Sequence, residues 1–131
     1  MQIEAYFQQF RRLIDNCSIL HSSNVTYDKR GTHEGFIRGI FYFVDDSVLH
    51  LREFVDVETE IDRLMYVYHY MDAANSLIFR YDNTGHHKKL NLSTYPHHKH
   101  IGSDGSVIAA NAPSLAEVLS EIEGIVRLPA L

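Results

Sequence analysis

The segment from His86 to His100, with the sequence HHKKLNLSTYPHHKH, concentrates side chains that could do chemistry. It holds five of the nine histidines of the chain and three of its 12 Lys and Arg residues. No Asp or Glu occurs between Asn83 and Ser103, although the chain carries 17 acidic residues. Imidazoles exchange protons or bind metal ions near neutral pH, and lysines attract anions. The segment therefore predicts an anion site, with phosphate as the candidate anion.

Two other interpretations of this segment stay open, a solvated connector and a zinc site. Neighbouring residues of an extended segment point to opposite faces, so only one of His97 and His98 can enter a given site. We expect His98 to point inward, with Lys99 or His100 at the rim, and we predict no metal and no cofactor. Because Pro96 has no N–H to donate, we expect a sheet edge or a loop here.

Length and composition favour one globular domain that covers residues 1–131. The chain is 131 residues long and 45% apolar, enough for a real core. Its formal net charge of −5 argues against a general nucleic-acid coating protein, so any such contact must be local. The single cysteine, Cys17, excludes an internal disulfide, and we expect it to be a buried structural thiol. We see no signal peptide and no membrane-spanning run, which predicts a soluble cytoplasmic protein without membrane contact.

Periodicity predicts an α+β fold, an antiparallel β-sheet built from successive hairpins with an N-terminal and a C-terminal helix packed on it. Apolar residues recur at helical spacing over residues 2–17 and again up to Leu128. Ser114 and Glu117 form a capping box at the start of the second helix. Between the helices the period is two, which predicts strands at 25–28, 36–44, 48–55, 64–71, 77–82 and 107–109.

The first long hairpin predicts a loop of Asp45, Asp46 and Ser47 that pairs Val44 with Val48. Phe41, Phe43, Leu49 and Leu51 then share one face, and Arg38, Tyr42, His50 and Arg52 lie on the other. In this register Glu53 falls on the apolar face, opposite Gly39. A carboxylate there is paired or functional, and we expect it to pair with an arginine.

The second hairpin places three polar side chains that could do chemistry on one face if Asp72 pairs with Leu77. His69 then lies opposite Arg80, and Asp82 lies on the same face. A structural network in which Asp82 holds Arg80 stays open beside a catalytic use. The other face carries Tyr66, Tyr68, Tyr70, Phe79 and Tyr81, which we expect to be core although such rings can also stack bases.

Four stretches resemble the TumE-type toxin family, once filed as a domain of unknown function. They are Leu51–Asp56, Tyr66–Asp72, Leu77–Asn83 and Tyr95–His100, and the resemblance covers about residues 36–125. The family resemblance implies the toxin of a prokaryotic type II toxin–antitoxin pair, with a cognate antitoxin protein as partner. It implies no catalytic residues, which we assign from residue chemistry alone.

Our leading hypothesis is a metal-independent ribonuclease with an RNA substrate. Cleavage needs a base for the 2′-OH proton, an acid for the leaving 5′-oxygen and cations for the phosphorane. We assign His69 and His98 as base and acid, Arg80 and Lys99 as phosphate-stabilising groups, and Asp82 as the group that orients His69 or Arg80. Substrate-binding roles go to residues of the same region: His86, His87, Lys88, Tyr68 and His100.

Two alternatives use the same residues. A non-catalytic protein-binding module would use its histidines to hold a loop or a structural metal, and a divalent-metal-dependent nuclease would add Glu53 or Asp82 as a ligand. A homodimer and a hetero-oligomer with the antitoxin both stay open.

Overall fold

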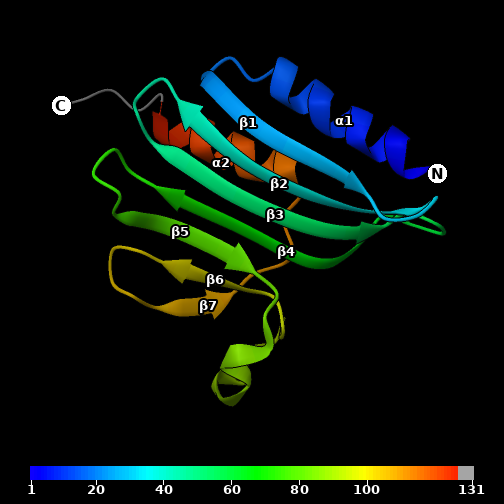
Figure 1. The fold of residues 1–131 in the computed structure, drawn as a ribbon. Coiled ribbons are helices and arrows are strands. Elements are labelled where there is room, and N and C mark those ends of the chain that lie inside the picture. Colours follow the sequence, from blue (N-terminus) through cyan, green and yellow to red (C-terminus); the bar gives the residue numbers. More distant parts are fainter. Residues whose placement is uncertain (127–131) are drawn as a thin grey trace.

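Seven antiparallel strands form one open sheet in the order of the chain, from β1 to β7 (Figure 1). The computed structural model describes residues 1–126, except the side chain of His86. The elements are α1 (Ile3–Asp15), β1 (Leu20–Lys29), β2 (Glu34–Phe43), β3 (Val48–Asp56), β4 (Asp62–Met71), β5 (Leu77–Asp82), η1 (Gly85–Leu90), β6 (His98–Ile101), β7 (Val107–Ala109) and α2 (Leu115–Val126). This confirms the α+β fold of successive hairpins with a helix at each end. The predicted end of the last helix at Leu128 lies outside the described residues.

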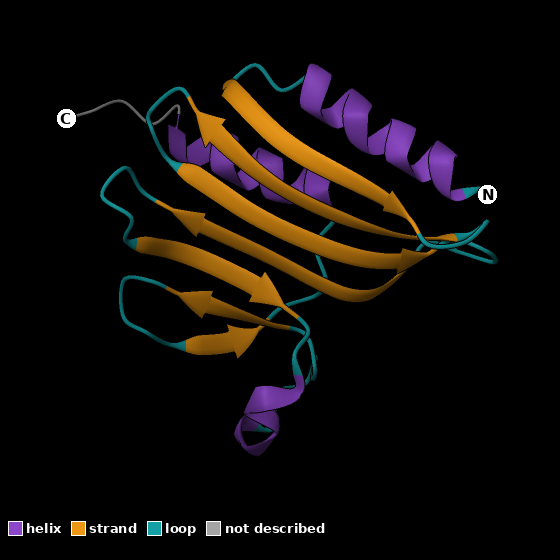
Figure 2. Cartoon of the chain, in the orientation of Figure 1, coloured by secondary structure: helices purple, strands orange, loops and turns teal. Residues whose placement is uncertain are grey.

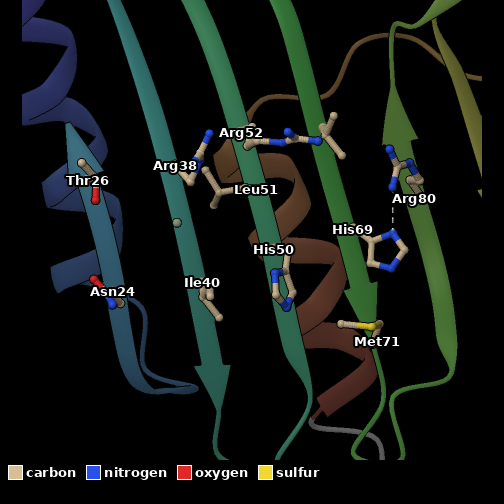
Figure 3. A pocket seen from close by; sticks show the side chains of 12 residues that line it. Asn24, Thr26, Arg38, Ile40, His50, Leu51, Arg52, His69, Met71 and Arg80 are labelled. Carbon is tan, nitrogen blue, oxygen red and sulfur yellow. Dashed lines mark hydrogen bonds between the residues drawn. The ribbon is translucent and has the colours of Figure 1, made fainter. Parts of the chain in front are cut away.

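Both helices cover the same face of the sheet and leave the other face open (Figures 1 and 3). Strand residues alternate between the faces, so the apolar residues of each strand meet the apolar stripes of α1 and α2. The capping box forms at the start of α2, where the Glu117 N–H donates to Ser114 Oγ at 3.2 Å and the Ser114 N–H donates to Glu117 Oε1 at 3.1 Å. The fully buried core includes Ile3, Ile37, Phe41, Leu49, Val55, Tyr68, Tyr70, Val118 and Ile122.

The close fit of α1 on β2 depends on Gly35. A Cβ atom at this position would lie 2.6 Å from Cζ of Phe7 and 2.7 Å from Cγ1 of Ile3. The absent side chain therefore lets the helix contact the strand backbone.

The first long hairpin keeps the predicted faces but not the predicted register. Its loop is one residue earlier, closed by a hydrogen bond from the Phe43 N–H to the Ser47 carbonyl, with Asp46 at a φ of 67°. Tyr42 pairs with Val48, so the expected pairing of Val44 with Val48 is wrong. Asp tolerates the left-handed conformation that such a loop requires. The observed pairing differs from the predicted one by two residues. Because side chains alternate with a period of two, every side chain stays on its predicted face.

Glu53 lies in the covered face, opposite Ile37, not Gly39. It accepts hydrogen bonds from the hydroxyls of Tyr6 and Tyr68, and Arg63 donates to the Tyr68 hydroxyl at 3.2 Å. Burial raises the pKa of Glu53, and the two tyrosine hydrogen bonds oppose that rise. The expected direct pairing with an arginine is thus wrong, since two phenols take that place.

The second hairpin has the predicted register at its centre. His69 pairs with Arg80, and Val67 pairs with Asp82. A bulge follows at Met71, and the Asp72 N–H donates to the Ser76 carbonyl, so the loop is one residue shorter than expected. These two pairs, which agree with the prediction, place His69, Arg80 and Asp82 on the open face.

The basic segment contributes an inner strand. Residues 98–101 form β6, which pairs with β5 on one side and β7 on the other. The expectation of an edge or a loop is wrong for these residues, because Pro96 precedes the strand and its missing N–H leaves no ladder position empty. Residues 85–90 form the short helix η1, which projects beyond the sheet next to β6 (Figure 2).

Candidate functional site

The open face of the sheet has a hollow of about 590 Å³ that spans β1 to β5 (Figure 3). Three guanidinium groups and two imidazoles reach it from neighbouring strands. No Asp or Glu is among the described residues that line it, so its charge is positive although the whole chain is acidic. The lining residues are Asn24, Thr26, Arg38, Gly39, Ile40, His50, Leu51, Arg52, Val67, His69, Met71 and Arg80.

Two histidines lie at paired positions of neighbouring strands in this hollow. His50 of β3 pairs with His69 of β4, and both side chains are on the open face (Figure 3). Arg80 lies on the other side of His69, with its Nη1 3.2 Å from His69 Nδ1. Because arginine only donates, His69 Nδ1 accepts and Nε2 carries the proton in this arrangement. Burial lowers the pKa of His69, and the positive charge of Arg80 lowers it further, so the neutral imidazole is favoured at pH 7.

Asp82 connects Arg80 to the histidines of β6. Its Oδ2 accepts from Arg80 Nε at 2.9 Å, and its Oδ1 accepts from the Thr84 N–H at 3.0 Å and from the Thr84 hydroxyl at 2.9 Å. Burial of this carboxyl raises its pKa, but the hydrogen bonds from Arg80 and Thr84 outweigh burial and hold the pKa below its usual range. The Nε2 atoms of His98 and His100 lie 2.9 and 3.7 Å from its two oxygens. Asp82 is thus an ionised group that orients Arg80.

Three imidazoles from η1 and β6 form a cluster beside Asp82. The ring centroids of His87, His98 and His100 lie 4.9 to 5.1 Å apart, and the rings meet edge to face. His98 is only 2% exposed. One candidate ligand nitrogen from each residue lies within 4.8 Å of the others.

Six of the ten predicted site residues are brought together, and His87 joins the other five through its ring contacts with His98 and His100. His69, Arg80, Asp82, His98 and His100 share the open face, and they form a continuous row from β4 to β6. His69 and His98 are separated by β5, which places their backbones about 10 Å apart or more. His98 points inward with His100 beside it, which agrees with the expected alternation.

The remaining predicted residues lie elsewhere. Lys99 points to the covered face, where its Nζ is 2.8 Å from Glu121 Oε2 and lies over the rings of Phe79 and Tyr81. The side chain of Tyr68 is fully buried beneath the sheet. Alternation along β4 and β6 separates both residues from the open face. Lys88 is exposed on η1, and the side chain of His86 lies outside the described part of the chain.

Sequence reasoning missed the residues that make the centre of the hollow. Alternation had placed Arg38, His50 and Arg52 on one face, but without a role. Their proximity to His69 follows from the β3–β4 register, which includes a bulge in β4 at Leu64. The acidic turn between these strands was the available signal, because its length determines which residue meets His69.

The comparisons with known proteins agree with the resemblance. A family model described as Toxin TumE matches residues 10–126. The chain belongs to the TumE toxin family. No curated protein and no solved structure gives a significant match. The TumE match includes the last part of α1, all seven strands, α2 and every residue of the hollow. Among the described residues, no helix is both long and apolar enough to cross a membrane.

Proposed function

We propose that this TumE-family toxin cleaves RNA on the open face of its sheet. The observation that carries the proposal is the hollow itself, where three arginines and two histidines gather and no carboxylate of residues 1–126 is in the lining. Such a surface attracts a phosphodiester and offers groups for proton transfer at neutral pH. The proposal rests on the toxin family for the role in the cell and on the hollow for the chemistry.

Phosphate binding falls to Arg38, Arg52 and Arg80. A guanidinium binds two phosphate oxygens through parallel N–H groups, and its charge stabilises a dianionic phosphorane. Arg80 has its Nε occupied by Asp82 and one Nη1–H directed at His69. The Asp82 contact at Nε fixes the plane of this guanidinium, so little order is lost when its Nη1–H leaves His69 for a phosphate oxygen.

Proton transfer falls to His69 and His50. His69 is held neutral, as a base must be, and a phosphate that draws Arg80 away from it frees its Nδ1 lone pair. His69 takes the 2′-OH proton, the 2′-oxygen attacks phosphorus, and the bond from phosphorus to the 5′-oxygen breaks. His50, entering as imidazolium, gives its proton to that oxygen. The products are a 2′,3′-cyclic phosphate and a 5′-hydroxyl, and no water is consumed.

The sequence-based choice of His98 as the acid is replaced by His50 in this proposal. His98 is 2% exposed and lies behind Asp82, whereas His50 is exposed in the hollow next to His69. A proton donor must come within about 3 Å of the leaving oxygen. Lys99 has no part in the proposal, because it lies on the covered face.

The test combines growth, RNA cleavage and folding. Induced wild-type protein should arrest growth, and its RNA fragments should end in cyclic phosphate and begin with 5′-hydroxyl. His69→Ala and His50→Ala should each reduce cleavage about a hundredfold to ten-thousandfold with the melting temperature nearly unchanged. His21→Ala, which changes an exposed histidine of β1, is the matched control and should stay fully active. Full activity of either site variant, or growth arrest with intact RNA, would overturn the proposal.

We further propose a cognate antitoxin protein as the physiological partner, on the evidence of family membership. Co-expression of the genomic neighbour should restore growth and protect RNA, and the neighbour should copurify with the toxin. A neighbour that neither binds the toxin nor relieves growth arrest would remove this part of the proposal.

A further inference from the structure

We propose that His87, His98 and His100 bind a zinc-class divalent ion that ties η1 to β6, which replaces the sequence-based prediction that no metal is bound. The site lies beside the hollow, and Asp82 separates it from Arg80. It is independent of the proposed ribonuclease chemistry, since none of its three ligands transfers a proton there. Its consequence is structural: the ion would hold the η1 segment against the rim of the open face.

The hydrogen bonding of His98 leaves one of its ring nitrogens available to bind a metal ion. Its Nδ1 lies 2.8 Å from the Pro96 carbonyl oxygen, which can only accept, so Nδ1 carries the proton. Neutral His98 then has its lone pair on Nε2, and this buried atom has no hydrogen-bond partner among the described residues. Ligand histidines commonly donate their other N–H to a backbone carbonyl, which fixes the ring and raises its basicity.

The nearest oxygen does not satisfy that nitrogen. Asp82 Oδ1 lies 2.9 Å from His98 Nε2, but in a geometry that is not a hydrogen bond, and it already accepts from the Thr84 N–H and hydroxyl. A lone pair that faces a carboxylate oxygen is electrostatically unfavourable. A cation between the imidazoles and the carboxylate removes this conflict, because both groups then face positive charge.

The imidazoles of His87 and His100 supply the other two nitrogens of the proposed coordination site. The three candidate nitrogens lie within 4.8 Å of one another. A tetrahedral ion with nitrogens at about 2.0–2.1 Å holds them about 3.4 Å apart. Small ring movements of the partly buried His87 and His100 close that difference.

The ligand set selects the ion. Three imidazole nitrogens suit zinc and its late transition-metal neighbours, whereas magnesium and calcium prefer oxygen. The fourth position is left to water, and the Asp82 charge offsets part of the ion's charge.

The position of His87 explains why the ion would matter for folding. The segment 85–90 is joined to β6 by the rings of His87, His98 and His100, whereas its apolar residue Leu90 is 52% exposed. A helix of six residues has little stability of its own. Binding to the folded state alone stabilises that state by mass action.

Metal binding is measured directly on the full chain, stripped with a chelator and titrated with zinc in a calorimeter. We expect one zinc per chain and a higher melting temperature. Cobalt should replace zinc and give the strong visible absorption of a tetrahedral nitrogen site. His87→Ala, which changes a residue outside the core, should weaken zinc binding at least about a hundredfold and remove the thermal shift.

His97→Ala is the matched control. His97 adjoins His98 in the sequence but lies against Tyr66, with its Nδ1 2.9 Å from the Tyr66 hydroxyl. It should keep the zinc affinity and the cobalt spectrum of the wild type. Wild-type protein without saturable zinc binding, or equal affinity in the His87→Ala variant, would overturn the metal site. Neither result bears on RNA cleavage, which is measured separately with the hollow variants.

Discussion

The two faces of the sheet are made from the same strands, but one is buried beneath the helices and the other is open. The covered face buries aromatic rings under two helices, and its fully buried carboxyl group, Glu53, is enclosed by tyrosine hydroxyls. The open face carries arginines and histidines around a hollow. Arg52 and Glu53 are neighbours in the chain, yet one meets solvent and the other is fully buried. A strand can therefore specify fold and function at alternate positions.

The two faces also differ in the groups whose pKa is perturbed. Burial raises the pKa of Glu53 in a site closed to substrate, whereas burial and Arg80 lower the pKa of His69 in an open hollow. A shifted pKa alone identifies neither a structural nor a catalytic group. Access to the hollow is what distinguishes His69.

The largest effect is expected from a charge placed in the covered face. Leu119→Asp puts an unpaired carboxylate beneath the sheet, where Leu119 is buried, and should destabilise the protein by about 4 kcal/mol or more, enough to unfold most marginal domains. Ser120→Asp changes the next, exposed residue of α2 and should shift stability by less than about 0.5 kcal/mol. Chemical unfolding of both variants measures the contrast, and equal stabilities would remove α2 from the core.

The adjacent pair Arg52 and Glu53 gives the sharpest comparison of the faces. Glu53→Ala leaves the hydroxyls of Tyr6 and Tyr68 buried without their acceptor and should cost about 3 kcal/mol of folding free energy. Arg52→Ala should cost less than about 0.5 kcal/mol, because its side chain is exposed.

The same two variants should differ in the opposite sense in RNA binding. Arg52→Ala should weaken binding and reduce its dependence on salt, since one phosphate contact is lost. Glu53→Ala should keep the salt dependence at a temperature where it is folded. Salt titrations of RNA affinity measure this, and an unchanged slope for Arg52→Ala would separate Arg52 from the phosphate site.

The sequence was sufficient where local signals determine structure. Helical period and the capping box located both helices. The predicted pairing of His69 with Arg80 is correct although Asp72 does not pair with Leu77, because the bulge at Met71 offsets the shorter loop. Alternation alone assigned the faces of β2 and β3 despite the wrong register. These features depend on residues close together in the chain, so a single sequence carries them.

The sequence was insufficient where pairing is not local. β6 pairs on both sides although it lacks an apolar pattern, because η1 and the turn after it return the chain to the sheet. The pairing of His50 with His69 depends on the turn after Asp56 and on the bulge in β4 at Leu64. The phenols around Glu53 come from α1 and β4, which no spacing in the sequence relates.

A smaller effect is expected at the start of α2. Ser114→Ala removes the hydroxyl that accepts the Glu117 N–H at 3.2 Å and should cost about 1 kcal/mol. Ser114→Asp restores an acceptor and should recover most of that loss. Urea unfolding of the three proteins measures the difference, and a Ser114→Ala variant as stable as the wild type would contradict a stabilising cap. RNA cleavage should be unchanged, because the cap lies far from the hollow in the chain and on the covered side.

The smallest effect is expected from the pH dependence of stability at His69. Its folded-state pKa is lowered by burial and then by Arg80, below the unfolded value of about 6.5. The unfolded chain therefore takes up this proton first as the pH falls below about 6.5, and the folded state loses stability relative to it. The raised pKa of Glu53 acts in the opposite direction, so the contribution of His69 must be isolated by difference. His69→Gln should lose less stability between pH 7 and pH 5 than the wild type, as measured by urea unfolding at each pH. An NMR titration of the His69 ring gives the folded-state pKa directly, and a value at or above 6.5 would show that Arg80 does not hold this imidazole in its neutral form.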